Sequence, residues 1–244
     1  MMMRSIAAAA MAVLLAAPAM AQGAPPPLDK AAVEKIVKEY LMANPEILVE
    51  MMSELKKRQE RLAQDSARKA IVERRSEIYD DPASPVGGNA KGTVTVVEFF
   101  DYHCTYCKQV QGPMQSLIKE DGNIRIVYKE LPILREESRL AAQAALAANN
   151  QGKYEQFHNA LMGARGVLTK ERILQLAKET GLDVAKLGKD MADPKISAAI
   201  DRNLELARVL DVSGTPAFVI GDQIVPGAIG LEEFRKIVAE ARKS

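Results

Sequence analysis

The two cysteines of the 244-residue chain, Cys104 and Cys107, stand close together in the segment FFDYHCTYCKQV. A structural disulfide across so short a gap would enclose almost no loop and would restrict the unfolded chain very little. Two thiols at this spacing close a small ring that can be opened again, which suits reversible thiol–disulfide exchange. The spacing therefore predicts a redox-active pair.

The residues on either side of the pair predict how it is positioned. The β-branched run TVTVVEFF over 93–100 is typical of a buried strand, and a helical pattern extends from Cys104 to about Lys119. At a helix start, unpaired N–H groups and the helix dipole favour a thiolate, so Cys104 is the expected nucleophile. Cys107, one turn further along, is expected to be the shielded resolving thiol.

A metal site is the main alternative for these cysteines, because CxxC is half of many zinc sites. The sequence has no second cysteine pair, and its two histidines are His103 and His158. His158 borders the apolar face of a helical segment and is expected to be an ordinary half-buried residue. His103 adjoins Cys104 and is a candidate to hold the thiolate or to join the sulfurs around Cu(I). We predict no resident metal or other cofactor, with Cu(I) binding as an open alternative.

The rest of the chain after the cysteines predicts an α/β protein. IRIVYKE over 124–130 indicates a second strand, and residues from about 138 to 210 carry only helical patterns. The segment SGTPAFVI then leads to a turn at Gly221-Asp222, a short strand QIV and a last helix from Leu231. This order of strand, helix, strand, helical insert, hairpin and helix is typical of a sheet covered by helices.

The Thr215-Pro216 pair in SGTPAF precedes a predicted strand far from the cysteines in sequence. It resembles the cis-proline loop of thioredoxin-fold proteins. In that fold the loop packs against the active-site sulfurs and offers its backbone edge to an extended substrate. We therefore predict a cis peptide bond before Pro216 and a substrate-binding role for both residues.

The first residues of the chain are typical of a signal peptide. Arg4 precedes an apolar run too short to span a bilayer, and small residues lead to a cleavage site after Ala21. An uncleaved anchor is the alternative. Export would place the cysteines in an oxidising compartment. The chain carries 33 basic and 32 acidic side chains, so no charge excess indicates a nucleic-acid partner.

Two amphipathic helices are predicted before the catalytic part. The first begins at Asp29, and Asn44-Pro45 ends it and begins the second. Apolar side chains recur about every seven residues, which suits self-association, although packing on the main domain is an equal alternative. The residues assigned to this predicted seam are Leu41, Leu48, Met52, Leu55 and Leu62.

The stretch DPASPVGGNAKG over 81–92 is rich in Pro and Gly and predicts a flexible linker. The predicted organisation is therefore a signal peptide at 1–21 and a helical oligomerisation segment with a linker helix at 22–80. The flexible linker at 81–92 and a catalytic domain at 93–244 follow in this predicted organisation.

Two resemblances to known families cover nearly all of the chain after the predicted signal peptide. VVEFFDYHCTYC, the helical insert and GTPAFVIGD…VPGAIGLEEF resemble the DsbA-like branch of the thioredoxin superfamily over residues 85–244. LDKAAVEKIVKEYLMANPEILVEMMSELKKRQE resembles the N-terminal segment of the ScsC (suppressor of copper sensitivity) proteins. The resemblance implies a thioredoxin fold with a large helical insertion, preceded by an N-terminal helical oligomerisation segment.

The DsbA-like resemblance also implies roles for single residues. Glu98, six residues before Cys104, matches a buried strand glutamate that relays a proton to and from the resolving thiol. Burial would raise the pKa of such a carboxyl, which suits that task. Thr105 and Tyr106, which we also expect to bind substrate, are a departure, because the best-known members have a histidine between the cysteines that stabilises the thiolate and makes them strong oxidants. A less oxidising pair is better suited to shuffling disulfides than to installing them.

The resemblance to ScsC implies a function. It implies a periplasmic thiol–disulfide oxidoreductase, a disulfide isomerase or reductase that acts on exported client proteins. It also implies an ScsB-like membrane reductase that keeps the cysteines reduced, and a homotrimer formed through residues 29–62. A DsbA-like oxidase and a copper-sequestering protein that uses the same cysteines are the alternatives.

Overall fold

The computed structural model describes residues 29–243, so the predicted signal peptide and its cleavage site after Ala21 lie outside the described residues. The chain divides between Leu55 and Lys56 into two compact units. None of the helices formed by the described residues has both the length and the apolar character needed to cross a membrane.

The N-terminal unit contains α1 (Lys30–Ala43) and the beginning of α2 (Glu46–Glu73). The carboxylate of Asp29 caps α1 by accepting a hydrogen bond from the Ala31 N–H, as a helix start requires. No side chain of α1 is buried. The five residues of the predicted seam are all exposed in the single chain: Leu41, Leu48, Met52, Leu55 and Leu62.

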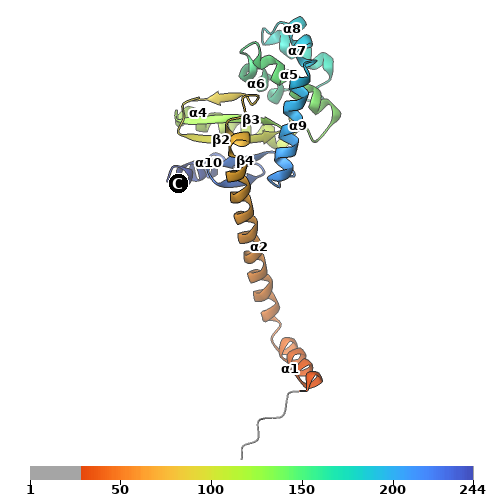
Figure 1. The fold of residues 1–244 in the computed structure, drawn as a ribbon, viewed down its shortest axis with the longest axis vertical. Coiled ribbons are helices and arrows are strands. Elements are labelled where there is room, and N and C mark those ends of the chain that lie inside the picture. The colour runs from red at the N-terminus through yellow and green to blue at the C-terminus, as the bar shows by residue number, and fades with distance from the viewer. Residues whose placement is uncertain (1–28, 244) are drawn as a thin grey trace, which may run out of the picture. The chain divides into compact units, whose positions relative to one another are not determined.

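The C-terminal unit is built on a five-stranded sheet, in the order β1-β3-β2-β4-β5 (Figure 1). Its central strand, β2, is parallel to β3 and antiparallel to β4. The β-branched and aromatic side chains of β2 are buried on both faces, which explains the uninterrupted apolar run in the sequence. The strands are β1 (Val86–Gly88), β2 (Val94–Phe100), β3 (Ile124–Glu130), β4 (Ala217–Ile220) and β5 (Gln223–Pro226).

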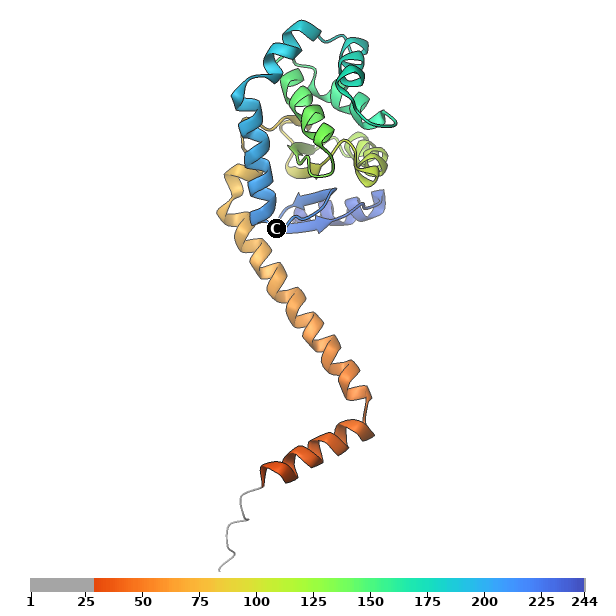
Figure 2. The same cartoon turned by 90° about the vertical axis from the view of Figure 1, so that its right-hand side faces the viewer.

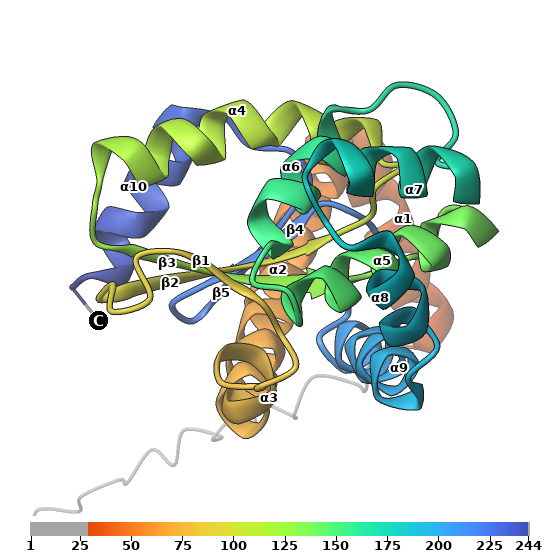
Figure 3. The same ribbon diagram turned by 90° about the horizontal axis from the view of Figure 1, so that it is seen from above.

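Helices cover both faces of the sheet. Helices α4 (Thr105–Glu120) and α10 (Leu231–Ala241) lie on one face, and α3 (Arg75–Tyr79) and α9 (Pro194–Val209) lie on the other (Figure 3). The helical insert joins β3 to β4, as the sequence predicts. Its helices are α5 (Glu136–Asn149), α6 (Tyr154–Gly163), α7 (Lys170–Glu179), α8 (Val184–Met191) and α9. The predicted fold class, a thioredoxin fold with a large helical insertion, is confirmed.

The prediction of a flexible linker over 81–92 is wrong. Residues 86–88 form the edge strand β1, in which Val86 pairs with Val127 of β3. The segment just before it is also part of the folded unit, because the buried ammonium of Lys129 donates to Glu77 O at 2.6 Å and to Ser84 Oγ at 2.7 Å. Backbone pairing and these hydrogen bonds order this Pro- and Gly-rich stretch. They could not be predicted from the residue types of the stretch.

Apolar packing shows that the catalytic unit begins before residue 93, the predicted start. Ile71 at the end of α2 and Ile78 of α3 are buried against the sheet face that carries Val97 and Phe99. Helix α9 lies beside α3 and contributes Leu206 to the same cluster (Figure 2). The predicted catalytic domain at 93–244 therefore lacks part of its own core.

Candidate active site

The redox pair lies where the central strand passes into α4. Cys104 is the N-cap residue of that helix, with extended backbone angles, and its Sγ accepts the Cys107 N–H at 3.2 Å. This is the position at which a helix presents unpaired N–H groups and the positive end of its dipole. The expectation that the strand delivers Cys104 to a helix start is confirmed.

The two cysteines differ in their surroundings. Cys104 is 5% exposed and Cys107 is 1% exposed, and both are free thiols. Burial raises the pKa of the Cys107 thiol well above its usual range, and the hydrogen bond with Cys104 raises it further. Cys107 therefore stays protonated, and Cys104 is the less deeply buried of the two thiols. This asymmetry is what a nucleophile and a resolving thiol require.

The loop before β4 lies against Cys104. The Thr215-Pro216 peptide bond is cis, as predicted, and Cys104 Sγ donates to the Thr215 carbonyl oxygen at 3.1 Å. The sheet register explains the approach, because Ala217 of β4 pairs with Phe99 of β2. The C-terminal end of β2 and the N-terminal end of β4, distant in sequence, therefore lie side by side.

Glu98 lies on β2 and is buried, as the sequence predicts. Burial raises its pKa to about 8, so the side chain exchanges protons near neutral pH. Glu98 and Cys107 line the same cavity of about 400 Å³, which runs between α4 and α6 and is also lined by Gln111 and Asn159. A cavity with polar walls has room for water. The Glu98 carboxyl and the Cys107 thiol therefore border the same space.

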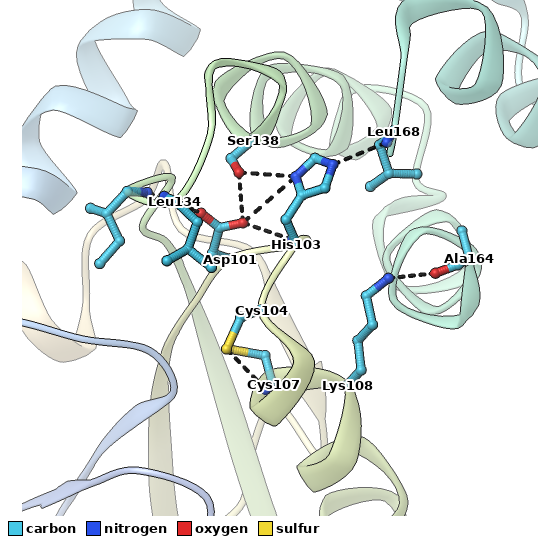
Figure 4. Close-up of polar contacts among 10 residues, drawn as sticks. Asp101, His103, Cys104, Cys107, Lys108, Leu134, Ser138, Ala164 and Leu168 are labelled. Carbon is cyan, nitrogen blue, oxygen red and sulfur yellow. Dashed lines mark hydrogen bonds and ion pairs between the residues drawn. The ribbon is translucent and has the colours of Figure 1, made fainter. Parts of the chain in front are cut away.

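His103 does not contact the sulfurs, contrary to the prediction. Its Nε2 accepts the Leu168 N–H at 3.0 Å, so the neutral ring carries its proton on Nδ1, which lies 3.0 Å from Ser138 Oγ (Figure 4). Burial lowers the pKa of His103, which favours this neutral ring. Both nitrogens are used inside the protein, so His103 supplies neither a charge for the thiolate nor a ligand beside the cysteines.

The remaining predicted residues lie at the surface of the site. Thr105 and Tyr106, between the cysteines, are both exposed at the start of α4. Among residues 29–243, no three His, Cys, Asp or Glu side chains gather closely enough to hold a metal ion.

Asp101 is a residue of the site that the sequence analysis missed. Its buried carboxylate accepts the His103 N–H at 2.7 Å and the Ser138 hydroxyl at 2.8 Å through Oδ1. Through Oδ2 it accepts the N–H groups of Ile133 and Leu134, both at 3.0 Å. Asp101 thereby fixes the three residues that separate the strand from Cys104. Its place directly after a buried strand and before the cysteines was the signal available in the sequence.

A second buried carboxyl, Glu130, was also missed. Tyr102 and Tyr154 both donate to its Oε1, at 3.0 and 2.8 Å, and burial raises its pKa well above the usual range. His158 contacts the Tyr102 hydroxyl at 3.1 Å within this cluster, and burial lowers the pKa of His158 to about 3. His158 is therefore a neutral core residue, more deeply buried than the sequence indicates.

A central strand that delivers a CxxC pair to a helix start, with a cis-proline loop beside it, defines a thioredoxin-fold protein with a redox-active dithiol. Comparison with known proteins gives the family. The sequence matches the DSBA-like thioredoxin domain over residues 95–239 and the Copper resistance protein ScsC N-terminal domain over residues 29–61. The chain belongs to the DSBA-like thioredoxin domain family and carries an ScsC N-terminal domain.

Solved structures agree with this assignment. A thioredoxin-like oxidoreductase from Silicibacter pomeroyi is 47% identical, with a TM-score of 0.68, over 70% of this chain and 98% of that one. Proteus mirabilis ScsC in a transitional conformation is 30% identical, with a TM-score of 0.67, over 89% of this chain and 100% of that one.

Several curated relatives are much larger proteins. The Na(+)/H(+) antiporter NhaA 1 of Salinispora arenicola is 30% identical over 164 residues, which make up 66% of this chain and 25% of that protein. The chain thus spans about a quarter of the length of this relative.

Proposed function

We propose that the protein is a thiol–disulfide oxidoreductase that reshuffles wrong disulfides in exported proteins of the periplasm. The observation that carries the proposal is the asymmetry of the pair. Cys104 lies at the N-terminus of α4, and Cys107 is buried and protonated beside the cavity that Glu98 lines. The family and the ScsC N-terminal domain support the same activity.

The chemistry follows from the positions of the groups. The Cys104 thiolate attacks one sulfur of a client disulfide, forms a mixed disulfide and expels the other client sulfur as a thiolate. That client thiolate can attack another disulfide of the client, and the client thiolate released in this exchange then attacks the mixed disulfide and expels the Cys104 thiolate, so that the bonds rearrange without net oxidation. Alternatively, Cys107 attacks Cys104 and releases a reduced client, and the two electrons come from the dithiol. Glu98 accepts the Cys107 proton through the cavity in this second route.

Isomerisation requires that the pair rest in the reduced state. Each client reduction leaves a Cys104–Cys107 disulfide, so a membrane reductase of the ScsB kind is the expected source of electrons. A pair that rests oxidised would instead act as a DsbA-like oxidase. The absence of a histidine between the cysteines, where Thr105 and Tyr106 stand, makes the pair a weaker oxidant, so the reductase must keep it reduced.

The exposed apolar faces of α1 and α2 support assembly into a homotrimer. Leu41, Leu48, Met52 and Leu55 have no partner within the described residues of one chain that buries them. A seven-residue apolar repeat suits a helical seam between copies. Three catalytic units around one client would hold it long enough for its disulfides to rearrange.

Two measurements test the proposal. Refolding of a client with scrambled disulfides should be accelerated by the reduced full chain and lost in the Cys104→Ser variant. The redox state of the pair, trapped by rapid alkylation in cells of the native host, should be reduced. A pair that rests oxidised in the cell would instead assign the oxidase role.

A further inference from the structure

His158 of α6 is the first member of a hydrogen-bonded chain that ends at the buried carboxyl of Glu130. Its Nδ1 lies 3.1 Å from the Tyr102 hydroxyl oxygen, and that hydroxyl donates to Glu130 Oε1 at 3.0 Å. A hydroxyl has one proton, and the Tyr102 proton is used in the bond to Glu130. The Tyr102 oxygen therefore accepts the N–H of His158 Nδ1. This fixes the tautomer of the neutral imidazole, because the nitrogen that donates is the one that keeps the proton.

The fixed tautomer leaves Nε2 of His158 with a free lone pair, and none of the described residues donates to it. In the described part of the chain, the fully buried side-chain atoms without a hydrogen-bond partner are Glu130 Oε2 and Thr215 Oγ1. Nε2 is not among them, so it borders open space. His158 is only 3% exposed, and the space that it lines is the cavity of about 400 Å³ that Glu98 and Cys107 also line. The acceptor nitrogen therefore faces this cavity.

Aromatic packing holds the His158 ring in this direction. Four ring centroids lie 4.7 to 5.6 Å from the centroid of the imidazole, and they belong to Phe100, Tyr102, Tyr128 and Tyr154. Close packing on this scale leaves little room for the ring to rotate and exchange its two nitrogens. Burial also lowers the pKa of His158 to about 3, so the ring accepts a hydrogen bond without taking up a proton.

We propose that His158 is a positioning residue for release of the mixed disulfide: its Nε2 holds the cavity water that carries the Cys107 proton to Glu98. This inference deepens the proposed function, because release of a reduced client needs the Cys107 thiolate. The Cys107 S–H gives its proton to the water oxygen while the water gives one of its own protons to the Glu98 carboxylate. The second O–H of the water donates to Nε2, so His158 ends the step unchanged. The Cys107 thiolate then attacks the Cys104 sulfur and expels the client thiolate.

The number of partners supports this placement of the water. A buried water makes two to four hydrogen bonds to polar groups that lack other partners. Nε2 of His158 and the groups of Glu98 and Cys107 together give three partners on the walls of one cavity. A water with all three partners is oriented before the reaction, so its orientation costs nothing when the Cys107 proton moves.

The tautomer of His158 is the first test. Long-range proton–nitrogen NMR of the reduced full chain, with isotope-labelled histidine, distinguishes a proton on Nδ1 from a proton on Nε2. The signals of His158 are those lost in His158→Gln. We expect the Nδ1–H form in the wild type and a shift toward the Nε2–H form in Tyr102→Phe. An Nε2–H form in the wild type would overturn the proposal.

Tyr154→Phe is the matched control for Tyr102→Phe. It removes an equal hydroxyl that donates to the same Oε1 of Glu130, at 2.8 Å, but leaves the bond between Tyr102 and His158 in place. We expect the control to keep the wild-type tautomer. An equal shift in both variants would show that Tyr102 does not hold the tautomer, and would overturn the proposed chain.

The rate of release is the second test. Asparagine at position 158 places an amide N–H where Nδ1 stands and nothing where Nε2 stands, whereas glutamine places an amide oxygen at the position of Nε2. Stopped-flow reduction of a small disulfide separates formation of the mixed disulfide from its release. We expect His158→Asn to slow release about tenfold with formation unchanged, and His158→Gln to stay within about twofold of the wild type.

Slowed release in His158→Asn with release retained in His158→Gln, both proteins being folded by circular dichroism, would support the proposal. Wild-type release in His158→Asn, or equal slowing in both variants, would overturn it. If either variant does not fold, the wild-type tautomer decides alone. Formation of the mixed disulfide by the wild type tests the proposed function separately, because Cys104 forms it without the cavity water.

Discussion

At the scale of single residues, two cysteines of the same type differ because the fold covers them differently. Cys104 lies at a helix start with its sulfur accepting an N–H, whereas Cys107 lies one turn deeper with a raised pKa. We expect Cys104 to be alkylated first when the reduced protein meets iodoacetamide at pH 6, as followed by mass spectrometry. Cys104→Ser and Cys107→Ser variants give the separate rates. Equal rates would remove the assignment of the nucleophile.

The buried carboxyl of Glu98 makes stability depend on pH. Its pKa is about 8 in the folded protein and 4.5 ordinarily, so between these values the unfolded chain releases a proton that the folded protein keeps. Its contribution to the free energy of unfolding is therefore full below pH 4.5 and is lost as pH rises to 8. We expect Glu98→Gln to be more stable than wild type by roughly 2 to 5 kcal/mol at pH 8 and nearly equal at pH 4. Urea unfolding of the reduced proteins at both pH values measures this.

The same variant tests the role of Glu98 in catalysis. Glutamine cannot accept the Cys107 proton, so Glu98→Gln should slow release of the mixed disulfide more than its formation. Stopped-flow measurement of both steps with a small disulfide separates them, and Gln111→Glu, on the wall of the same cavity, is the control for an added or lost charge there. Unchanged release in Glu98→Gln would assign the proton to another acceptor.

His103 shows why a site cannot be completed from sequence neighbours alone. The sequence places it beside Cys104, but side-chain direction depends on tertiary partners, here Leu168 and Ser138. Cys104, Cys107, Glu98 and the cis-proline loop were predictable because the fold class fixes where each of them must lie. Asp101 was missed although it directly follows a buried strand, because three of its four hydrogen bonds come from Ile133, Leu134 and Ser138, which lie more than 30 residues away in the sequence.

At the scale of elements, regular strands and helices were predictable and the edge strand was not. β2, β3 and the β4–β5 hairpin are rich in β-branched and aromatic residues, whereas β1 consists of Val86, Gly87 and Gly88. The Tyr128 ring lies where a Cβ on Gly87 would be, at 2.9 Å, so glycine is needed there for packing. Side-chain periodicity cannot reveal a strand whose residues contribute mainly backbone.

The corrected boundary predicts which shortened chains fold. A chain of residues 56–244 keeps Ile71, Ile78 and Tyr79 in the core, whereas one of residues 81–244 loses all three. We expect the shorter chain to be less stable by roughly 5 kcal/mol or more, because each lost side chain leaves apolar surface uncovered. Urea unfolding monitored by circular dichroism compares them. Equal midpoints would show that residues 56–80 are dispensable for folding.

At the scale of the whole molecule, the prediction concerns self-association. The full chain should be a trimer by light scattering. The double variant Leu48→Glu/Met52→Glu, which places two charges on the predicted seam, should be a monomer whose catalytic unit unfolds at the same temperature as in the wild type. Val72→Glu, an exposed apolar position of the same helix outside the seam, is the control. The monomer should still reduce small disulfides but accelerate refolding of a scrambled client less. A monomeric wild-type chain would contradict the seam.

The bonds from Lys129 to Glu77 and Ser84 have a consequence for modular exchange between relatives. The ScsC N-terminal domain match ends at residue 61 and the DSBA-like domain match begins at residue 95. From these matches alone, residues 62–94 would be taken for a linker that a chimera could replace. They contain α3 and β1, which complete the sheet and its second core. A chimera that grafts a foreign assembly helix must therefore join within α2 before Ile71. A graft at residue 95 would leave the buried Lys129 ammonium without its hydrogen bonds to Glu77 and Ser84.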